Sequence, residues 1–201
     1  MGVQWAINSL SKGYFVPELD TIIDVDANPI ADERFVSRCR DQLDADGVVT
    51  IPGFIRPAAL KALVAEAEAE KKNAYFTAST HNAYLTPPRD DLPADHVFNR
   101  QITSSKGCIT TDQVPQGSAL HSIYNSPVFQ QFLAAVVGKT ALYEYADPLS
   151  SINVHFADDG QELGWHFDNS SFAVTLLLQA PDDGGQFQYV RDVRDADAGD
   201  L

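Results

Sequence analysis

Apolar residues recur at helical spacing in three stretches of the chain. In the first, residues 32–45, Phe35 and Cys39 share one helical face with other apolar side chains, and a glycine follows as a stop signal. The second stretch begins with Pro57 and the third with Ser126 and Pro127, and proline is favoured in the first turn of a helix. The pattern therefore predicts three amphipathic helices, at residues 32–45, 57–73 and 126–138.

The pattern changes in the middle of the chain and again near residue 140. Residues 74–116 show no clear periodicity and contain four prolines, which is typical of a functional loop or lid. From residue 140 onward, short apolar runs alternate with turns rich in Asp and Gly. Together with an earlier short run, they predict strands at residues 47–54, 140–146, 150–157, 172–180 and 185–190.

Helices followed by consecutive antiparallel strands indicate an α+β fold that ends in a β-sandwich or jelly roll. A length of 201 residues suits a single domain. We expect a helical amino-terminal part over about residues 1–139 and a β core over about residues 140–201.

The composition argues against several classes of partner. The formal net charge is −14 and no Lys/Arg patch occurs, so we expect no nucleic-acid partner. Two cysteines form no disulfide framework and favour a reduced, cytoplasmic compartment. The first residues lack the pattern of a signal peptide, and every apolar run is too short to span a bilayer. We therefore expect no membrane association, and the oligomeric state stays open.

Candidate chemistry lies in "LGWHFDNSSFAVTLLLQ", residues 163–179. Alternate residues of a strand point to the same side, so His166 and Asp168 are expected to project together, with Phe167 turned away. An imidazole and a carboxylate held side by side are two thirds of the 2-His-1-carboxylate triad that binds Fe(II). The alternative is a surface His and Asp near a turn, because His-x-Asp by itself is a common pattern.

The residues that flank this motif carry a family resemblance. "INVHFADDGQELGWHFD", the later "DDGGQF" turn and the amino-terminal "DGVVTIPGFIRPAALKALVAEAE" resemble the iron(II)- and 2-oxoglutarate-dependent oxygenases. The resemblance implies a double-stranded β-helix with Fe(II), 2-oxoglutarate and O₂ as cofactor and co-substrates. A closer resemblance, over most of residues 100–191, is to the subgroup that hydroxylates or chlorinates amino acids.

Asp168 bears on the choice between these two reactions. Halogenases of this subgroup carry Gly or Ala in place of the carboxylate, which frees a coordination position for chloride. Because Asp168 occupies that position here, the resemblance implies hydroxylation of an unactivated C–H bond in a free or N-substituted amino acid. The alternatives are a non-catalytic β-sandwich binding module, an inactive fragment, or a halogenase, which Asp168 opposes.

Four polar residues are candidates to contact 2-oxoglutarate. In the predicted strand 172–180, Thr175 and Gln179 share one face, which suggests that they line a cavity and hydrogen-bond a ligand there. The resemblance makes both of them candidate contacts, and the alternative is a buried polar pair with partners inside the protein. Asn153 and His155 alternate on the preceding predicted strand and are expected to line the same cavity.

Three further residues are candidates to bind the substrate. Arg100 is a basic residue in the predicted lid of an acidic protein, and a guanidinium can hold a carboxylate bidentately. The resemblance places Arg100 on the substrate's carboxylate and Asn169 and Asp147 near its other polar groups. The alternative for each is an ordinary surface residue.

The resemblance also implies residues that this sequence lacks. The family has a second histidine on a later strand and an arginine or lysine beyond it, but no histidine follows His166. Arg191 and Arg194 come too early in the strand order to be that basic residue. We therefore expect the chain to be the amino-terminal portion of a longer oxygenase domain, with two of its three metal ligands.

Overall fold

The computed structural model describes residues 18–143, 145–168, 170–191 and 193. The chain divides into two compact units, each built from two segments of sequence. The first, here called the helical unit, comprises residues 1–73 and 109–154. The second, the hairpin unit, comprises residues 74–108 and 155–201.

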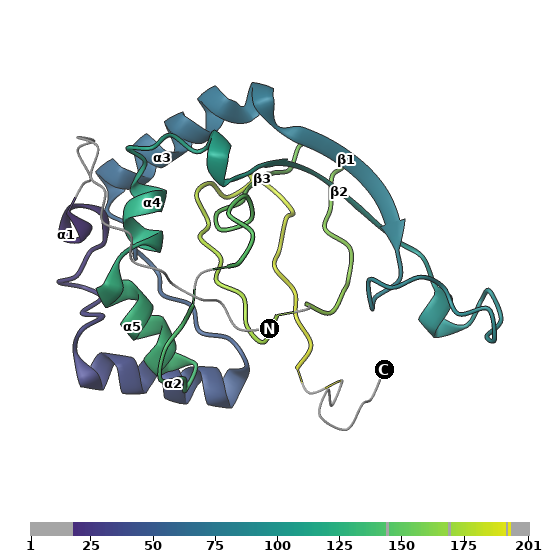
Figure 1. The fold of residues 1–201 in the computed structure, drawn as a ribbon, viewed down its shortest axis with the longest axis horizontal. Helices are drawn as coiled ribbons and strands as arrows, with labels where there is room; N and C mark the ends of the chain where they lie inside the picture. Colours follow the sequence, from purple (N-terminus) through teal and green to yellow (C-terminus); the bar gives the residue numbers. More distant parts are fainter. Residues whose placement is uncertain (1–17, 144, 169, 192, 194–201) are drawn as a thin grey trace. The chain divides into compact units, whose positions relative to one another are not determined.

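The helical unit contains all three helices that the sequence pattern predicts (Figure 1). Its elements are α1 (Leu19–Ile22), α2 (Glu33–Asp46), α3 (Pro57–Glu70), the 3₁₀ turns η1 (Lys71–Asn73) and η3 (Thr111–Gln113), α4 (Ala119–Tyr124) and α5 (Pro127–Val136). The helices at 32–45, 57–73 and 126–138 are thus confirmed to within a few residues at each end. No helix in the described part of the chain is long and apolar enough to cross a membrane.

Local signals account for the ends of α2. The Asp32 carboxylate accepts hydrogen bonds from the backbone N–H groups of Arg34 and Phe35, both at 3.0 Å, and so caps two of the donors that a helix start leaves unpaired. Gly47 ends the helix with φ +74°, a left-handed conformation that costs glycine little.

The apolar core of the described residues lies almost entirely in the helical unit. Ile23 and Leu63 are 0 % and 1 % exposed. The Phe35 and Phe132 rings, from α2 and α5, lie 5.9 Å apart between their centroids, within the range of favourable aromatic pairs. The amphipathic faces that predicted these helices are therefore the faces that build the core.

The hairpin unit is organised around a small sheet with strand order β1-β2-β3. β1 (Tyr75–His81) pairs antiparallel with β2 (Ile102–Ile109), in a register that runs from Tyr75 opposite Cys108 to His81 opposite Ile102. β3 (Val154–Phe156) lies on the other side of β2. The 3₁₀ turn η2 (Val97–Asn99) lies in the loop that joins β1 to β2.

The position of these strands corrects the sequence prediction. β1 and β2 both lie in the stretch 74–116, which was predicted to be irregular. Their sequences, "YFTASTH" and "ITSSKGCI", are dominated by Ser, Thr and other small residues, so they show little apolar alternation. They are strands because they pair with each other along seven register positions, a non-local cause that periodicity does not report.

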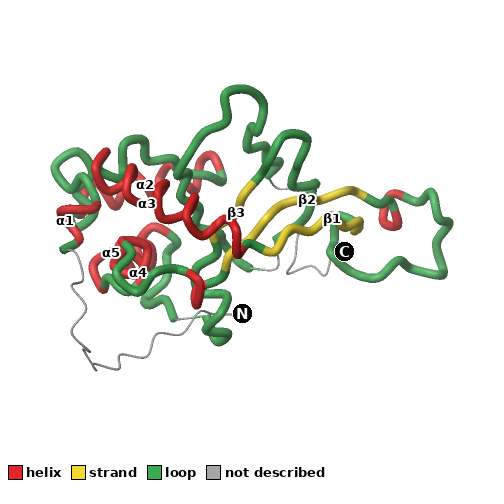
Figure 2. Tube along the Cα trace, turned by 90° about the horizontal axis from the view of Figure 1, so that it is seen from above, coloured by secondary structure: helices red, strands yellow, loops and turns green. Residues whose placement is uncertain are grey.

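Most of the strands that were predicted from apolar runs are not present. Residues 47–54 contribute no strand, and next to them only an isolated bridge joins Ile23 to Ile55. Of the predicted strand 150–157, only Val154–Phe156 is paired. No strand occurs in the described residues of 140–146, 172–180 and 185–190, which are drawn as loop (Figure 2).

The physical reason is that a strand needs a hydrogen-bonding partner as well as a suitable composition. In 172–190, apolar side chains such as Leu177 and Phe187 are 72 % and 77 % exposed. The fold is therefore mixed helix and sheet with a small three-stranded sheet, and the described residues do not confirm the predicted jelly roll.

Candidate functional site

His166 and Asp168 lie together in the hairpin unit. His166 Nε2 is 3.3 Å from Asp168 Oδ1, and the two side chains are 23 % and 55 % exposed. The segment that carries them is not part of a strand, although a strand was predicted to explain their common direction. The structure nevertheless brings the two groups to one place and leaves them accessible to a ligand.

The His166 ring is oriented by its own backbone neighbourhood. Its Nδ1 lies 2.7 Å from the carbonyl oxygen of Gly164, and because a carbonyl can only accept, Nδ1 must carry the proton. In the neutral ring, Nε2 then presents a lone pair toward Asp168. Metal-binding histidines commonly have this arrangement, with one nitrogen on a backbone carbonyl and the other on the metal.

The donor set suits a divalent cation. An Nε2 lone pair and a carboxylate oxygen that face each other at 3.3 Å repel unless a proton or a cation lies between them. At metal–ligand bonds of about 2.1 Å, two ligand atoms in neighbouring octahedral positions are about 3.0 Å apart, close to this separation. His166 and Asp168 therefore fit two positions of a metal site, and the described residues contain no cluster of three or more such ligands.

Phe167, between the two polar residues, anchors the motif to the loop after β1. Its backbone N–H donates to the carbonyl oxygen of Ala83 at 2.8 Å. Its ring packs against Tyr84, with 5.2 Å between centroids, and Tyr84 in turn stacks on Phe98 at 4.6 Å. The Phe167 side chain was predicted to point away from His166 and Asp168, and it packs against an aromatic residue of the loop after β1.

Two buried asparagines give this loop its shape. Asn82, with 0 % exposure, accepts from the N–H groups of Tyr84 and Thr86 through Oδ1. Asn99 accepts from the Arg89 N–H at 2.8 Å and donates back to the Arg89 carbonyl at 2.9 Å. Sequence reasoning missed these residues because an asparagine that closes a loop looks like any other polar loop residue.

Two of the predicted substrate-binding residues, Arg100 and Asp147, belong to different units. Arg100 is exposed in the hairpin unit, two residues before β2 begins. Asp147, in the helical unit, accepts from the Leu149 N–H at 3.0 Å and the Ser150 hydroxyl at 2.8 Å, and these hydrogen bonds lower the pKa of its carboxyl. Asp147 therefore stabilises the turn that it begins. Asn169 lies outside the described residues.

The strand that was predicted to carry two contacts of 2-oxoglutarate is absent. Thr175 and Gln179 are both exposed and lie outside any strand, which corrects the expectation that they share one face of a strand, and their role toward 2-oxoglutarate stays a prediction. Asn153 is exposed and donates to the Ser150 carbonyl at 3.1 Å, within the helical unit. His155 is on β3, where partial burial, with a smaller effect from the charge of Lys106, lowers the pKa of its imidazole.

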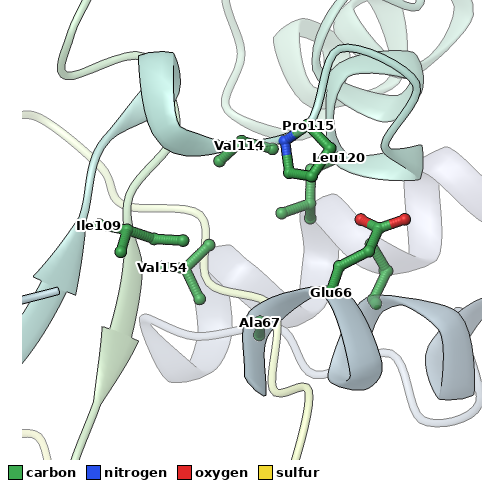
Figure 3. A pocket seen from close by; sticks show the side chains of 8 residues that line it. Glu66, Ala67, Ile109, Val114, Pro115, Leu120 and Val154 are labelled. Carbon is green, nitrogen blue, oxygen red and sulfur yellow. The ribbon is translucent and has the colours of Figure 1, made fainter. Parts of the chain in front are cut away.

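A small, mostly apolar pocket occurs in the helical unit. Apolar side chains such as Ile109, Leu120 and Val154 line it, together with Glu66 from α3 (Figure 3). Glu66 Oε2 is buried and lacks a hydrogen-bond partner among the described residues. None of the residues predicted for metal, co-substrate or substrate lines this pocket.

These features define a mixed α and β protein that holds an imidazole and a carboxylate together beside a β-hairpin. The model of the Halogenase D family matches residues 31–198, and the chain belongs to this family. Membership in a halogenase-like family agrees with the oxygenase resemblance at a coarse level and indicates an enzyme. No curated protein sequence matches the chain.

Proposed function

We propose that this protein is an Fe(II)- and 2-oxoglutarate-dependent dioxygenase that hydroxylates an unactivated C–H bond of a free or N-substituted amino acid. The observation that carries the proposal is the His166–Asp168 pair, 3.3 Å apart with the histidine proton held on Nδ1. Membership in the Halogenase D family supports a halogenase-like oxygenase. The proposal includes the jelly roll of that superfamily and a cytoplasmic location.

His166 and Asp168 would hold the Fe(II) ion. When bound with 2-oxoglutarate and O₂, the metal supplies the oxidising chemistry that replaces a C–H hydrogen by a hydroxyl group. The Gly164 carbonyl keeps the proton on His166 Nδ1, so that Nε2 stays available as a ligand. Asp168 contributes a negative charge that offsets part of the metal's charge.

Arg100 remains the proposed contact for the substrate's carboxylate. It is exposed in the hairpin unit, the same unit that carries His166 and Asp168. Asn169 is adjacent in sequence to Asp168 and is kept as a proposed substrate contact. Asn153, His155, Thr175 and Gln179 are all kept as proposed contacts of 2-oxoglutarate, and each is exposed to solvent.

Halogenation is the second candidate, because the family that matches is described as Halogenase D. Asp168 opposes it, since a carboxylate in the position beside His166 occupies the place that chloride needs. The two reactions differ in the group that is transferred, and one measurement separates them. Products formed from a panel of free and N-acylated amino acids, in excess chloride, are analysed by mass spectrometry.

The expected result is 2-oxoglutarate-dependent addition of one oxygen atom to at least one member of the panel. A dominant chlorinated product from the unmodified protein would replace hydroxylation by halogenation. Absence of succinate formation with every amino acid, combined with retained metal binding, would favour the binding-module alternative.

A further inference from the structure

Ser104, on β2, is buried at the point where the hairpin meets the segment that carries His166. The serine is 9 % exposed, and its Oγ accepts a hydrogen bond from the Gly164 N–H at 2.9 Å. The same Oγ lies 2.7 Å from His81 Nε2, on the neighbouring strand β1. A hydroxyl with two partners in a buried place has its orientation determined by both of them.

The direction of each hydrogen bond follows from the chemistry of the groups. His81 Nδ1 lies 2.9 Å from the Asn82 carbonyl oxygen, which only accepts, so Nδ1 carries a proton. The Gly164 N–H only donates, so the single proton of the Ser104 hydroxyl is available for His81 Nε2. All these groups are satisfied when His81 is neutral and protonated on Nδ1.

Gly164 connects this arrangement to His166. Its N–H is held by Ser104, and its carbonyl oxygen accepts from His166 Nδ1 at 2.7 Å. These two groups belong to different peptide units, so Ser104 acts by fixing the place of Gly164 and not through conjugation. The His81 and His166 rings also meet edge to face, with 6.1 Å between centroids.

The backbone approaches β2 closely enough that only glycine fits at position 164. A Cβ added there would lie 2.5 Å from Ile102 Cγ2 and 2.5 Å from the Thr103 carbonyl oxygen, closer than non-bonded atoms approach. The absence of that Cβ lets the Gly164 N–H reach a hydroxyl that is buried in the hairpin. Gly164 and Ser104 therefore work as a pair.

We propose that Ser104, supported by His81, is a positioning residue that holds Gly164 and thereby fixes the Nδ1–H tautomer and the direction of His166 Nε2. This inference rests on the proposed metal-binding function of His166 but concerns residues that do not touch the metal. Ser104→Ala leaves the Gly164 N–H and His81 Nε2 without their partner. Loss of a group that directly holds a metal-binding histidine typically weakens metal binding about 10- to 100-fold. Because Ser104 acts through Gly164, the lower end of that range is expected.

Two measurements test the proposal on the whole chain. Nitrogen-15 NMR of the metal-free protein, at a pH where both imidazoles are neutral, distinguishes the Nδ1–H from the Nε2–H tautomer. Calorimetry with Co(II) alone gives the metal affinity. The wild-type protein is expected to show the Nδ1–H tautomer for His81 and His166, and Ser104→Ala is expected to show a tautomer mixture at His166 with Co(II) binding about 10-fold weaker or more.

Matched variants separate positioning from general loss of structure. Ser105→Ala removes the neighbouring hydroxyl, which accepts the Glu162 N–H at 3.3 Å, and should leave the His166 tautomer and Co(II) affinity unchanged. Ser104→Thr keeps the hydroxyl and should restore both. If Ser104→Ala does not fold, His81→Phe takes its place, because it removes the acceptor of the Ser104 proton.

A wild-type His166 protonated on Nε2 would overturn the proposal, whatever the metal affinity. So would a folded Ser104→Ala protein, or the His81→Phe protein in its place, whose tautomer and Co(II) affinity equal those of Ser105→Ala. These outcomes differ from failure of the proposed function. That function fails when the wild-type protein forms no succinate, and the tautomer measurement still decides the positioning role.

Discussion

At the scale of single residues, the proposed function depends most on one carboxylate, that of Asp168. Asp168 faces His166 Nε2 at 3.3 Å and is about half exposed. Removing its side chain should therefore change the stability of the hairpin unit little. A phenotype of Asp168 variants should therefore report on ligand chemistry and not on stability.

Asp168→Ala is expected to weaken binding of Fe(II) or Co(II) by about 10- to 100-fold or more. That range is typical when only an outer partner of a metal ligand is lost. The reason is that the variant removes a charged ligand itself. Anaerobic calorimetry measures the affinity, with Asp159→Ala, an exposed aspartate in a turn, as the control. Equal affinities for the two variants would remove Asp168 from the metal site.

Asp168→Gly extends the same reasoning to the product. It empties the position beside His166 and could admit chloride, but efficient chlorination also requires the substrate to be held nearer chloride than hydroxide. The unmodified protein is expected to hydroxylate in excess chloride, and the glycine variant to lose most of that activity. Mass spectrometry of the products measures both.

At the scale of elements, the helices have local determinants and the strands do not. α2 is specified by a capping aspartate, an apolar face and a terminal glycine, all within 16 residues of sequence. β2, by contrast, depends on β1, on β3 and on the segment at 162–164 for its partners, as the Ser105 N–H donates to the Glu162 carbonyl at 2.7 Å. The two kinds of element therefore respond differently to substitution.

Asp32→Ala should lower the free energy of unfolding by about 0.5–2 kcal/mol, because two N–H groups at the start of α2 lose their acceptor. Asp32→Asn keeps a side-chain oxygen at the cap and should cost much less. Chemical denaturation followed by circular dichroism measures both. Equal losses for the two variants would show that charge, and not capping, is the contribution of Asp32.

His155 on β3 is expected to make the free energy of unfolding depend on pH, and the direction follows from the shift of its pKa. Its pKa is lowered in the folded protein, first by partial burial and then by Lys106 on β2, so the unfolded chain binds a proton more readily. Stability is therefore expected to be retained above about pH 6.5 and to fall as the pH drops through the folded pKa.

NMR titration of the ring proton measures this pKa directly. Lys106→Met should raise it only in part, because burial is the larger cause. His155→Gln should reduce the loss of stability on acidification relative to the unmodified protein. A His155 pKa at or above about 6.5 in the folded protein would contradict this account.

At the scale of the whole molecule, the two units are stabilised by different means. The helical unit buries Ile, Leu, Val and Phe side chains, whereas the buried side chains of the hairpin unit are mostly polar: Asn82, Asn99 and Ser104, with Phe156 as the large apolar one among the described residues. A net charge of −14 is distributed over both. Self-repulsion of this charge opposes the compact state.

Raising the salt concentration from about 0.01 M to about 0.15 M shortens the screening length from about 30 Å to about 8 Å. We therefore expect the thermal unfolding midpoint to rise over this range, since the repulsion among the acidic groups is screened. Differential scanning calorimetry with sodium chloride measures the shift. A midpoint that falls with salt would mean that favourable ion pairs, such as Arg56 with Asp24 at 3.5 Å, outweigh the repulsion.

The sequence by itself determined the three amphipathic helices, because helix periodicity and capping act over short distances. It also predicted that His166 and Asp168 meet, but their segment is not the strand that was to bring them together, and contacts such as the Phe167 N–H to the Ala83 carbonyl place it. Only the tertiary structure decided which segments become strands. The Ser- and Thr-rich β1 and β2 pair with each other, while the more apolar residues 172–180 have no strand partner among the described residues. The bonds from Ser104 to His81 and Gly164 were likewise undetectable in sequence, because they join residues 23 and 60 positions apart.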